Sequence, residues 1–457
     1  MSLSDEDYAQ LAQEIPSPDE PFLRQFTAGS VRLRDQESAL RADTGFRNSL
    51  SPLARRAAAI VTKIRERENE TVWTGQQDLG TPFALAKPLL ETTDLWRIIR
   101  RLPKGGVLNA NLSNMVDIDW LLDVVFKTPG MHISADAPLD SSTALEGATV
   151  KFGFRQTETS EASVWTRGYV PGTWRGLKKA ANEFNDGGEP AFRNWLRMQC
   201  VISKESVEQH ATREAIWKRL GRCFAITESM ISYEPIFRAF LRHIMSTLHA
   251  ENVNWIELRR RRILADEDLY DAILLGTRRL GSAQELHRHP LLVDLVKEKR
   301  ILIETSPFGS ELLRISELER TNPLPALIAR GVPCALGSDC PSALRSAGAV
   351  GPSHDYWKLL QGWGGLGIEG LGALAENGVR WAAFEDEDAK AWGAGVREAS
   401  LGRGIKAQRL KQWATAWEEF CLWIVTEYGD ELGDEPGDIQ ARSLDIEADQ
   451  RKGKAEP

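Results

Sequence analysis

Polar side chains that could carry chemistry follow several strand-like runs of this chain. They include amides, hydroxyls, carboxylates, an imidazole and a thiol, which are the groups used for acid–base, nucleophilic and metal-binding chemistry. The candidates are Asn109 and Asn111 in GVLNAN, Ser282 in RRLGS, Glu304 and Ser306 in RILIETSPF, Asp339 and Cys340 in VPCALGSDCP, and His354 and Asp355 in HDYW. Their repeated position after strands predicts one shared polar pocket.

Each catalytic candidate also has a structural interpretation. Asp339 suits a residual metal ligand or a general base, but an aspartate just before a proline also caps turns. Cys340 suits a nucleophile beside a helix start, or a small buried side chain. His354 and Asp355 suit a polar site near the last strand. The residue types alone leave these alternatives open.

The elements that must position these residues alternate between strand and helix patterns. Strands are expected near 106–111, 252–259, 278–282, 300–308 and 332–341. Helical patterns precede the last three strands, in DLYDAILLGT, HPLLVDLVKEK and PLPALIAR. This rhythm predicts an α/β fold of the TIM-type (β/α) barrel, in which functional groups gather at the carboxyl ends of the strands.

The flanking regions differ from the barrel region in composition. Residues 1–45 are expected to form a polar, poorly ordered or loosely docked arm, and 46–102 a helical extension with helices over 53–68 and 89–101. The barrel is assigned to 103–400, a C-terminal helix to 401–428, and an acidic disordered tail to 429–457.

The bulk composition narrows the class of protein. A formal net charge of -8 over 457 residues disfavours a nucleic-acid-binding protein. The five cysteines form no C-x-x-C pair, which favours a reducing compartment and hence a cytoplasmic location. Neither a signal peptide nor a membrane span is expected, because no suitable apolar run occurs.

Several of these motifs, in this order, resemble the adenosine deaminase-related growth factor branch of the adenosine deaminase family. The segment LPKGGVLNANLSNMVDIDWLL is similar to the family's first strand, and NVNWIELR to its second. The three later strand motifs and HDYW match the family's last strands. The resemblance runs from about residue 50 to 425 and implies a metal-dependent hydrolase in which zinc activates water to attack a purine nucleoside.

Transferred residue by residue, the resemblance implies a degraded zinc site. The family's His-x-His pair falls on Asn109 and Asn111, whose neutral amides are weak zinc ligands. Its activating histidine falls on Ser282, and its paired aspartates fall on Asp339 and Cys340. Asp339 is thus the one matched ligand position, and no zinc cofactor is expected. Glu304 and Ser306 match the family's Glu-x-Cys-Pro text and suit supporting or packing roles in the pocket.

The fifth-strand motif of the family, His-Ala-Gly-Glu, has no match. RRRRILADED at 259–268 joins the second-strand text directly to the helix before the sixth strand. About three βα units are therefore missing, on the order of a hundred residues. Either the barrel is incomplete or the gene model has lost an exon. An incomplete barrel would leave open strand edges, which predicts a homo-oligomer that covers them.

Three functions follow from this sequence. The first is a pseudoenzyme or scaffold that binds a purine-like or other small polar ligand. The second is a repurposed, metal-independent isomerase, lyase or cyclase that uses the old pocket. The third is an adenosine deaminase with a truncated gene model, which explains the missing strands but not the replaced histidines. No nucleic-acid or membrane partner is expected.

Overall fold

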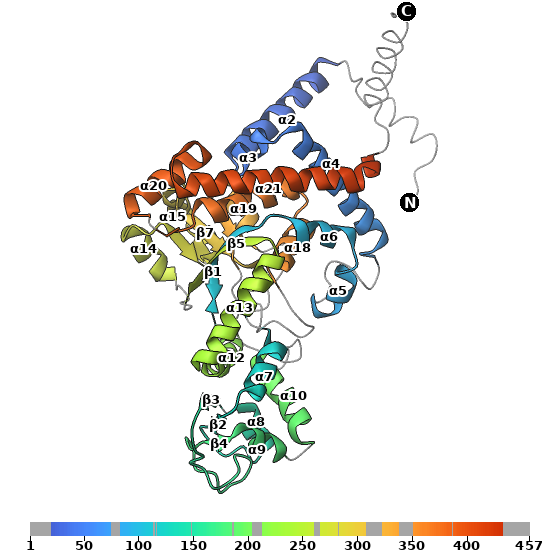
Figure 1. The fold of residues 1–457 in the computed structure, drawn as a ribbon. Helices are drawn as coiled ribbons and strands as arrows, with labels where there is room; N and C mark the ends of the chain where they lie inside the picture. The colour runs from blue at the N-terminus through green and yellow to red at the C-terminus, as the bar shows by residue number, and fades with distance from the viewer. Residues whose placement is uncertain are drawn as a thin grey trace, which may run out of the picture.

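The structure, a computed structural model, has mixed helices and strands (Figure 1). It describes residues 20–74, 83–112, 115, 117–147, 149–184, 187–202, 213–259, 266–281, 283–307, 322–337, 351–385 and 387–432. Among these, no helix is both long enough and apolar enough to cross a membrane.

The N-terminal region is helical from Pro21. Helix α2 (Pro21–Leu40) buries none of its residues and projects from the body, while α3 (Thr44–Ser49) and α4 (Pro52–Thr71) follow (Figure 1). Helix α4 begins where the Ser51 side chain accepts a hydrogen bond from the Ala54 amide. The expected single helix over 89–101 is instead two, α5 (Phe83–Leu90) and α6 (Asp94–Arg101), because Thr93 caps a new helix start.

Five parallel strands are present where the sequence predicts them. Strand β1 (Gly105–Asn111) pairs with β5 (Val253–Arg259), and β7 (Leu302–Thr305) pairs with both β6 (Arg279–Gly281) and β8 (Cys334–Leu336). Helices α12 (Arg213–Ile231) and α13 (Glu234–Ala250) precede β5. Helices α14 (Asp266–Leu274), α15 (Pro290–Glu298) and α17 (Leu324–Ala329) precede the last three strands in turn, and a short turn of 3-10 helix, η3 (Gln284–Arg288), follows β6.

The described strands do not form a closed eight-stranded barrel. They form a two-stranded and a three-stranded parallel sheet. Near the ends of two strands, Gly337 just past β8 lies against Asn109 of β1. At the outer edges, the guanidinium group of Arg279 on β6 pairs with the carboxylate of Glu257 on β5, with Nη1 and Oε1 2.9 Å apart. Side chains therefore bridge the two outer strands, which were expected to present open edges.

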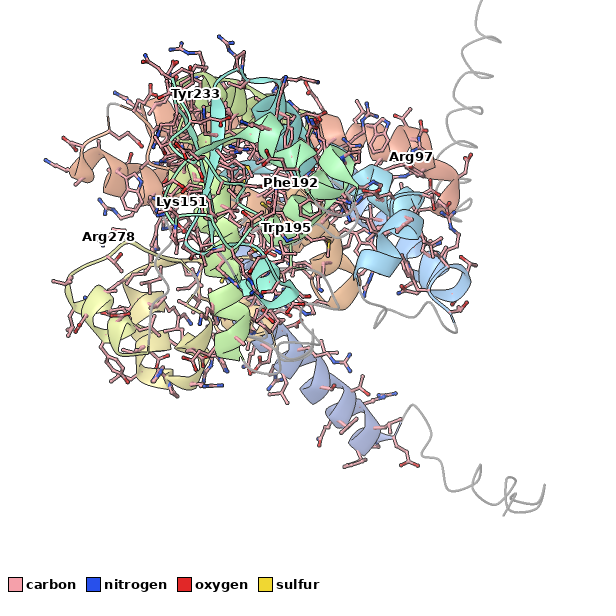
Figure 2. The ribbon with its side chains drawn as sticks, turned by 90° about the horizontal axis from the view of Figure 1, so that it is seen from below. Arg97, Lys151, Phe192, Trp195, Tyr233 and Arg278 are labelled. Atoms are coloured by element: carbon pink, nitrogen blue, oxygen red, sulfur yellow. The ribbon has the colours of Figure 1, made fainter. Side chains whose placement is uncertain are left out.

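A separate α+β unit interrupts the expected barrel region and was not predicted. Its antiparallel sheet has the order β3 (Val150–Phe154), β2 (Met131–Ala135), β4 (Arg175–Gly176). Helices α7 (Ile118–Lys127), α8 (Ser142–Gly147), α9 (Leu177–Asn182) and α10 (Gly188–Cys200) surround it. Figure 2 shows Phe192 and Trp195 of α10 side by side, with their rings 5.7 Å apart. Strands this short, one of them two residues long, give little periodic signal.

The C-terminal helices cover the parallel strands. Helix α18 (Pro352–Gly362) leads to α19 (Gly367–Arg380), which packs on β1, and α20 (Ala389–Glu398) leads to α21 (Ile405–Tyr428), which crosses the molecule (Figure 1). Two 3-10 turns, η5 (Ala399–Leu401) and η6 (Gly429–Leu432), flank α21. Trp413 and Trp417 of α21 pack against Phe46, with tilted and edge-on rings, which ties this helix to the N-terminal region.

Candidate functional site

Asn109 lies where the ends of three strands meet. A Cβ atom at Gly281 of β6 would lie 3.0 Å from Nδ2 of Asn109, and one at Gly337 would lie 3.2 Å from its Cβ. The ladder between β1 and β5 shifts register between Val107 and Ala110, and such an irregularity re-aims side chains. The two glycines leave the space that the Asn109 side chain fills.

Asn111 ends β1 opposite Arg259 of β5 and is buried. Both predicted asparagines of β1 thus lie at the carboxyl end of that strand, as expected for pocket residues. Each side chain presents a neutral amide. The end of β1 can accept and donate hydrogen bonds, but it supplies neither an imidazole nor a negative charge.

Glu304 is the centre of a buried charged network. Its carboxylate is 1% exposed and lies 3.4 Å from Nε of Arg279, which also binds Glu257. The Glu304 carboxylate also approaches Gly281, where a Cβ would lie 3.5 Å from Oε2. One arginine therefore faces two carboxylates on neighbouring strands. Glu304 and Asn109 both lie beside Gly281, and the Glu304 carboxylate is paired with Arg279.

Ser306 and Asp355 come together from β7 and α18. The Ser306 hydroxyl donates to Oδ1 of Asp355 at 3.4 Å, and both side chains are buried. This contact joins two candidates that lie far apart in the sequence. It places a carboxylate of α18 beside the residue that follows β7.

His354, the residue before Asp355 on α18, contacts the N-terminal helices. Its Nδ1 accepts a hydrogen bond from the Gly351 amide, so its Nε2 carries the hydrogen and faces Oε1 of Glu91 at 3.4 Å. Its ring packs on Trp96, with 4.5 Å between ring centroids. The hydrogen bond from His354 lowers the pKa of Glu91 to about 2. His354 thus contacts Glu91, just after α5, and Trp96 of α6.

Three predicted site residues lie outside the described residues. They are Ser282, which follows β6, and Asp339 and Cys340, which follow β8. Their roles stay predictions from the sequence.

Arg279 and Glu257 are site residues that sequence reasoning missed. Both lie inside recognised strand motifs, RRLGS and NVNWIELR. The signal in the sequence that could have identified them is a charged residue inside a short strand. Such a strand is expected to be buried, so its charged side chain needs a partner. Only the pairing of distant strand edges shows that these two charges meet.

The described residues do not fit a zinc ion. At the end of β1 the donors are amides, and no group of three histidine, cysteine, aspartate or glutamate side chains among the described residues could hold a metal. The nearby Glu304 carboxylate is already paired with Arg279. We therefore derive no chemistry through zinc at this site.

Comparison with known proteins identifies the class. No family model matches the chain. Adenosine deaminase 2-A of Danio rerio is 18% identical over 71% of this chain and 84% of its own length, and human adenosine deaminase 2 is 18% identical over 76% and 83%. Adenosine deaminase 2 of Dictyostelium discoideum is 38% identical over a shorter stretch, 24% of this chain and 20% of its own length. The chain is therefore similar in sequence to adenosine deaminases, and these three relatives are of the adenosine deaminase 2 type.

A solved structure resembles the chain only weakly. It is a zinc-bound amidohydrolase from Burkhoderia ambifaria, 13% identical, with a TM-score of 0.33 over 71% of this chain and 95% of its own. We draw no inference about fold or function from a likeness at this level.

The alignments also show that the relatives contain residues that this chain lacks. The alignment with the Danio rerio protein is 443 positions long but takes in only 71% of the 457 residues here. Within the aligned region, more than a hundred residues of that relative therefore fall opposite gaps in this chain.

Proposed function

We propose that this adenosine deaminase-like protein binds a small polar, purine-like ligand and does not carry out zinc-dependent deamination. The proposed binding site is at the carboxyl ends of β1, β6, β7 and β8. The observation that carries the proposal is the donor set at the end of β1, where Asn109 and Asn111 stand at the positions of the family's His-x-His pair. Amide oxygens bind zinc much more weakly than imidazole nitrogens.

The remaining polar groups suit binding by hydrogen bonds. Asn109 offers both a donor and an acceptor, as a purine edge does. Glu304 and Asp355 offer carboxylate oxygens, but each already has a neighbour, Arg279 and Ser306. Groups held this way orient a ligand better than they transfer protons, which supports binding over catalysis.

We also propose that this chain has lost about three βα units that its relatives contain. The gap of more than a hundred aligned positions agrees in size with three βα units. The abrupt passage from β5 to α14 through 260–265 is where we place it. The Arg279–Glu257 bridge supports this placement, because it joins the strands on either side of the gap.

The test combines metal analysis with activity and binding assays on the purified full chain. We expect less than stoichiometric zinc, no conversion of adenosine to inosine by absorbance, and saturable binding of adenosine in a thermal-shift titration. The variant Asn109→Ala should lose that binding, and Asn254→Ala, on the exposed face of β5, should keep it. Stoichiometric zinc with turnover would overturn the proposal, and product formation without zinc would favour a repurposed enzyme.

Sequencing the transcript across the codons for 258–270 separates a real deletion from a lost exon. A continuous transcript that encodes the present sequence supports the proposal. Additional coding sequence there would favour a deaminase with a truncated gene model.

The cellular setting is also part of this proposal. Four of the cysteines, Cys200, Cys223, Cys334 and Cys421, are buried free thiols, which supports a reducing, cytoplasmic environment. We also propose self-association, because α2 has unburied apolar side chains, Phe22 and Phe26 among them.

A further inference from the structure

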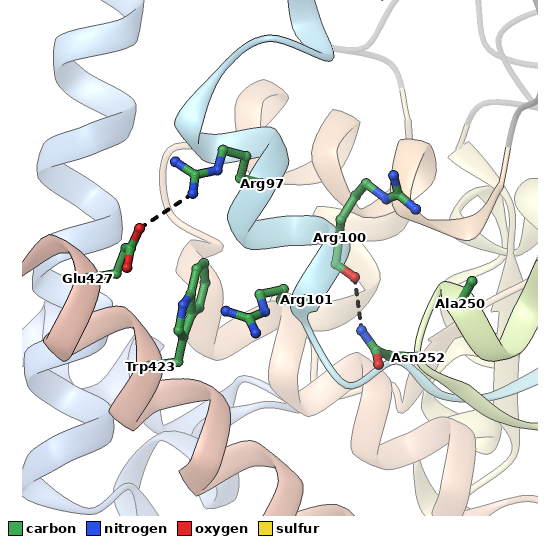
Figure 3. A pocket seen from close by; sticks show the side chains of 7 residues that line it. All are labelled: Arg97, Arg100, Arg101, Ala250, Asn252, Trp423 and Glu427. Carbon is green, nitrogen blue, oxygen red and sulfur yellow. Dashed lines mark hydrogen bonds and ion pairs between the residues drawn. The ribbon is translucent and has the colours of Figure 1, made fainter.

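A second pocket lies at the other end of the parallel strands. It has a volume of about 470 Å³ and is lined by Arg97, Arg100, Arg101, Ala250, Asn252, Trp423 and Glu427 (Figure 3). Helix α6 ends at Arg101, just before β1 starts, and α13 ends at Ala250, just before β5 starts. The pocket therefore lies at the starts of β1 and β5, whereas Asn109 and Asn111 lie near the end of β1.

The lining of this pocket is predominantly cationic. Three arginines from the last two turns of α6 line the pocket together with one carboxylate, Glu427, which lies 3.4 Å from Arg97. Asn252 adds an amide, whose Nδ2 donates to the carbonyl of Arg100 (Figure 3). The balance of charge at this surface favours an anion.

The three arginines differ in how far neighbouring carboxylates neutralise them. Arg97 lies 3.5 Å from Asp94 and 3.4 Å from Glu427. The Arg100 guanidinium is half exposed and lies 3.8 Å from Glu251. The Arg101 guanidinium lies 4.3 Å from the ring centroid of Trp423, and no ion pair within the described part of the chain involves it. The ring holds Arg101 in place without satisfying its charge, so its N–H groups are pre-oriented for a ligand.

The ends of two helices would ordinarily repel an anion here, since their terminal carbonyls carry partial negative charge. The buried amino group of Lys104 takes up several of these carbonyls. Its Nζ donates to the carbonyl oxygens of Ile99 and Glu251, each at 2.9 Å, and to that of Leu102 at 3.3 Å. These carbonyls point inward to Lys104, which leaves the outer surface to the arginines.

We propose that this pocket binds a small phosphate-bearing molecule. Guanidinium groups match phosphate oxygens with paired hydrogen bonds, and the volume accommodates a small organic phosphate as well as an inorganic one. Nothing in the proposed purine site is required for this binding, because this pocket lies at the starts of β1 and β5 and the proposed purine site lies at the carboxyl end of β1.

The test is calorimetric titration of the full chain at low salt with pyrophosphate, with glycerol 2-phosphate, and with glycerol as the uncharged comparison. We expect the phosphates to bind and glycerol not to bind. The double variant Arg97→Ala/Arg100→Ala should weaken binding about tenfold or more. The variant Glu427→Gln should strengthen it about two- to fivefold, because it removes the competing carboxylate.

The matched control is Arg238→Ala, which removes an exposed arginine of α13 away from this pocket and should leave affinity unchanged. Binding of pyrophosphate alone assigns the site to inorganic phosphates, and binding of both probes extends it to phosphate monoesters. The proposal is overturned if neither phosphate binds, or if Arg238→Ala weakens binding as much as the double variant. It is also overturned if Glu427→Gln, which keeps all three arginines, fails to raise the affinity.

Discussion

At the scale of single residues, buried charges in this protein are held by specific neighbours. Lys104 is fully buried, and burial lowers its pKa to about 7. Its Nζ lies among carbonyl oxygens at the end of α6 and at Glu251. The residue therefore satisfies carbonyls that two helix ends would otherwise leave buried without donors.

Replacing Lys104 with methionine should lower the free energy of unfolding by about 2–4 kcal/mol, because several buried carbonyls lose their donor. Urea unfolding measures this change. Lys411→Met, on the exposed face of α21, is the control and should change stability by less than about 0.5 kcal/mol. Equal effects of the two substitutions would contradict the capping role.

Glu91 provides a prediction about pH. Because His354 holds its pKa at about 2 in the folded state, below the usual 4.5, Glu91 stabilises the fold above pH 4.5. That stabilisation is lost as the pH falls from 4.5 towards 2. In urea unfolding across this range, Glu91→Gln should show a shallower loss of stability than the parent protein. Parallel curves for the two proteins would show that the His354 contact is not stabilising.

The candidate residues were predictable from the sequence to the extent that they follow strands. Asn109, Glu304 and Ser306 could be assigned to strand ends because each follows a β-branched or apolar run. The partner of each could not be assigned. The Ser306–Asp355 contact and the orientation of His354 depend on how α18 is rotated about its axis, which no local pattern specifies.

At the scale of elements, α19 and β1 approach so closely that only glycine fits between them. A Cβ at Gly106 would lie 2.7 Å from the carbonyl oxygen of Gly378, and one at Gly378 would lie closer still to that of Gly106. Backbone atoms on both sides cannot move aside as a side chain can. This contact fixes the position of β1, and with it Asn109.

Gly378→Ala should therefore destabilise the protein by about 1–3 kcal/mol through overpacking. Gly393→Ala is the matched control in a neighbouring helix, α20. There the new Cβ would meet only Nη1 of Arg397, at 3.7 Å. It should stabilise by up to about 1 kcal/mol, since alanine favours helix. Thermal unfolding of both variants tests this, and equal melting temperatures would refute the close contact.

Element prediction succeeded for strands flanked by clear helices and failed for the α+β unit. The five parallel strands are separated by amphipathic helices, so the change of period marks each boundary. In the unit, β2 is buried on both faces and β4 is two residues long. Such strands are defined by their neighbours in space, here β3 and the helices around it, rather than by alternation along the chain.

At the scale of the whole molecule, the Arg279–Glu257 pair replaces backbone pairing between the outer strands. Each side chain is 15% exposed, and Arg279 also faces the buried Glu304. Removing Arg279 would leave the buried Glu304 and the largely buried Glu257 without this cation.

Arg279→Met should thus lower the free energy of unfolding by about 3–5 kcal/mol, and a double-mutant cycle with Glu257→Gln should reveal strong coupling. The reference is the exposed pair Arg238–Glu234, whose side chains are about two-thirds exposed. Its coupling should stay below about 0.5 kcal/mol. A coupling for Arg279–Glu257 no larger than this reference would mean that the pair does not join the two sheets.

Strand β1 also forms a wall shared by two hydrophobic cores. Leu108 packs in the core under the N- and C-terminal helices, whereas Val107 and Ala110 pack in the core of the α+β unit. Local opening of either half would expose one face of the same strand. Amide protons of β1 should consequently exchange only with global unfolding, so that two halves which look separate behave as a single cooperative foldon.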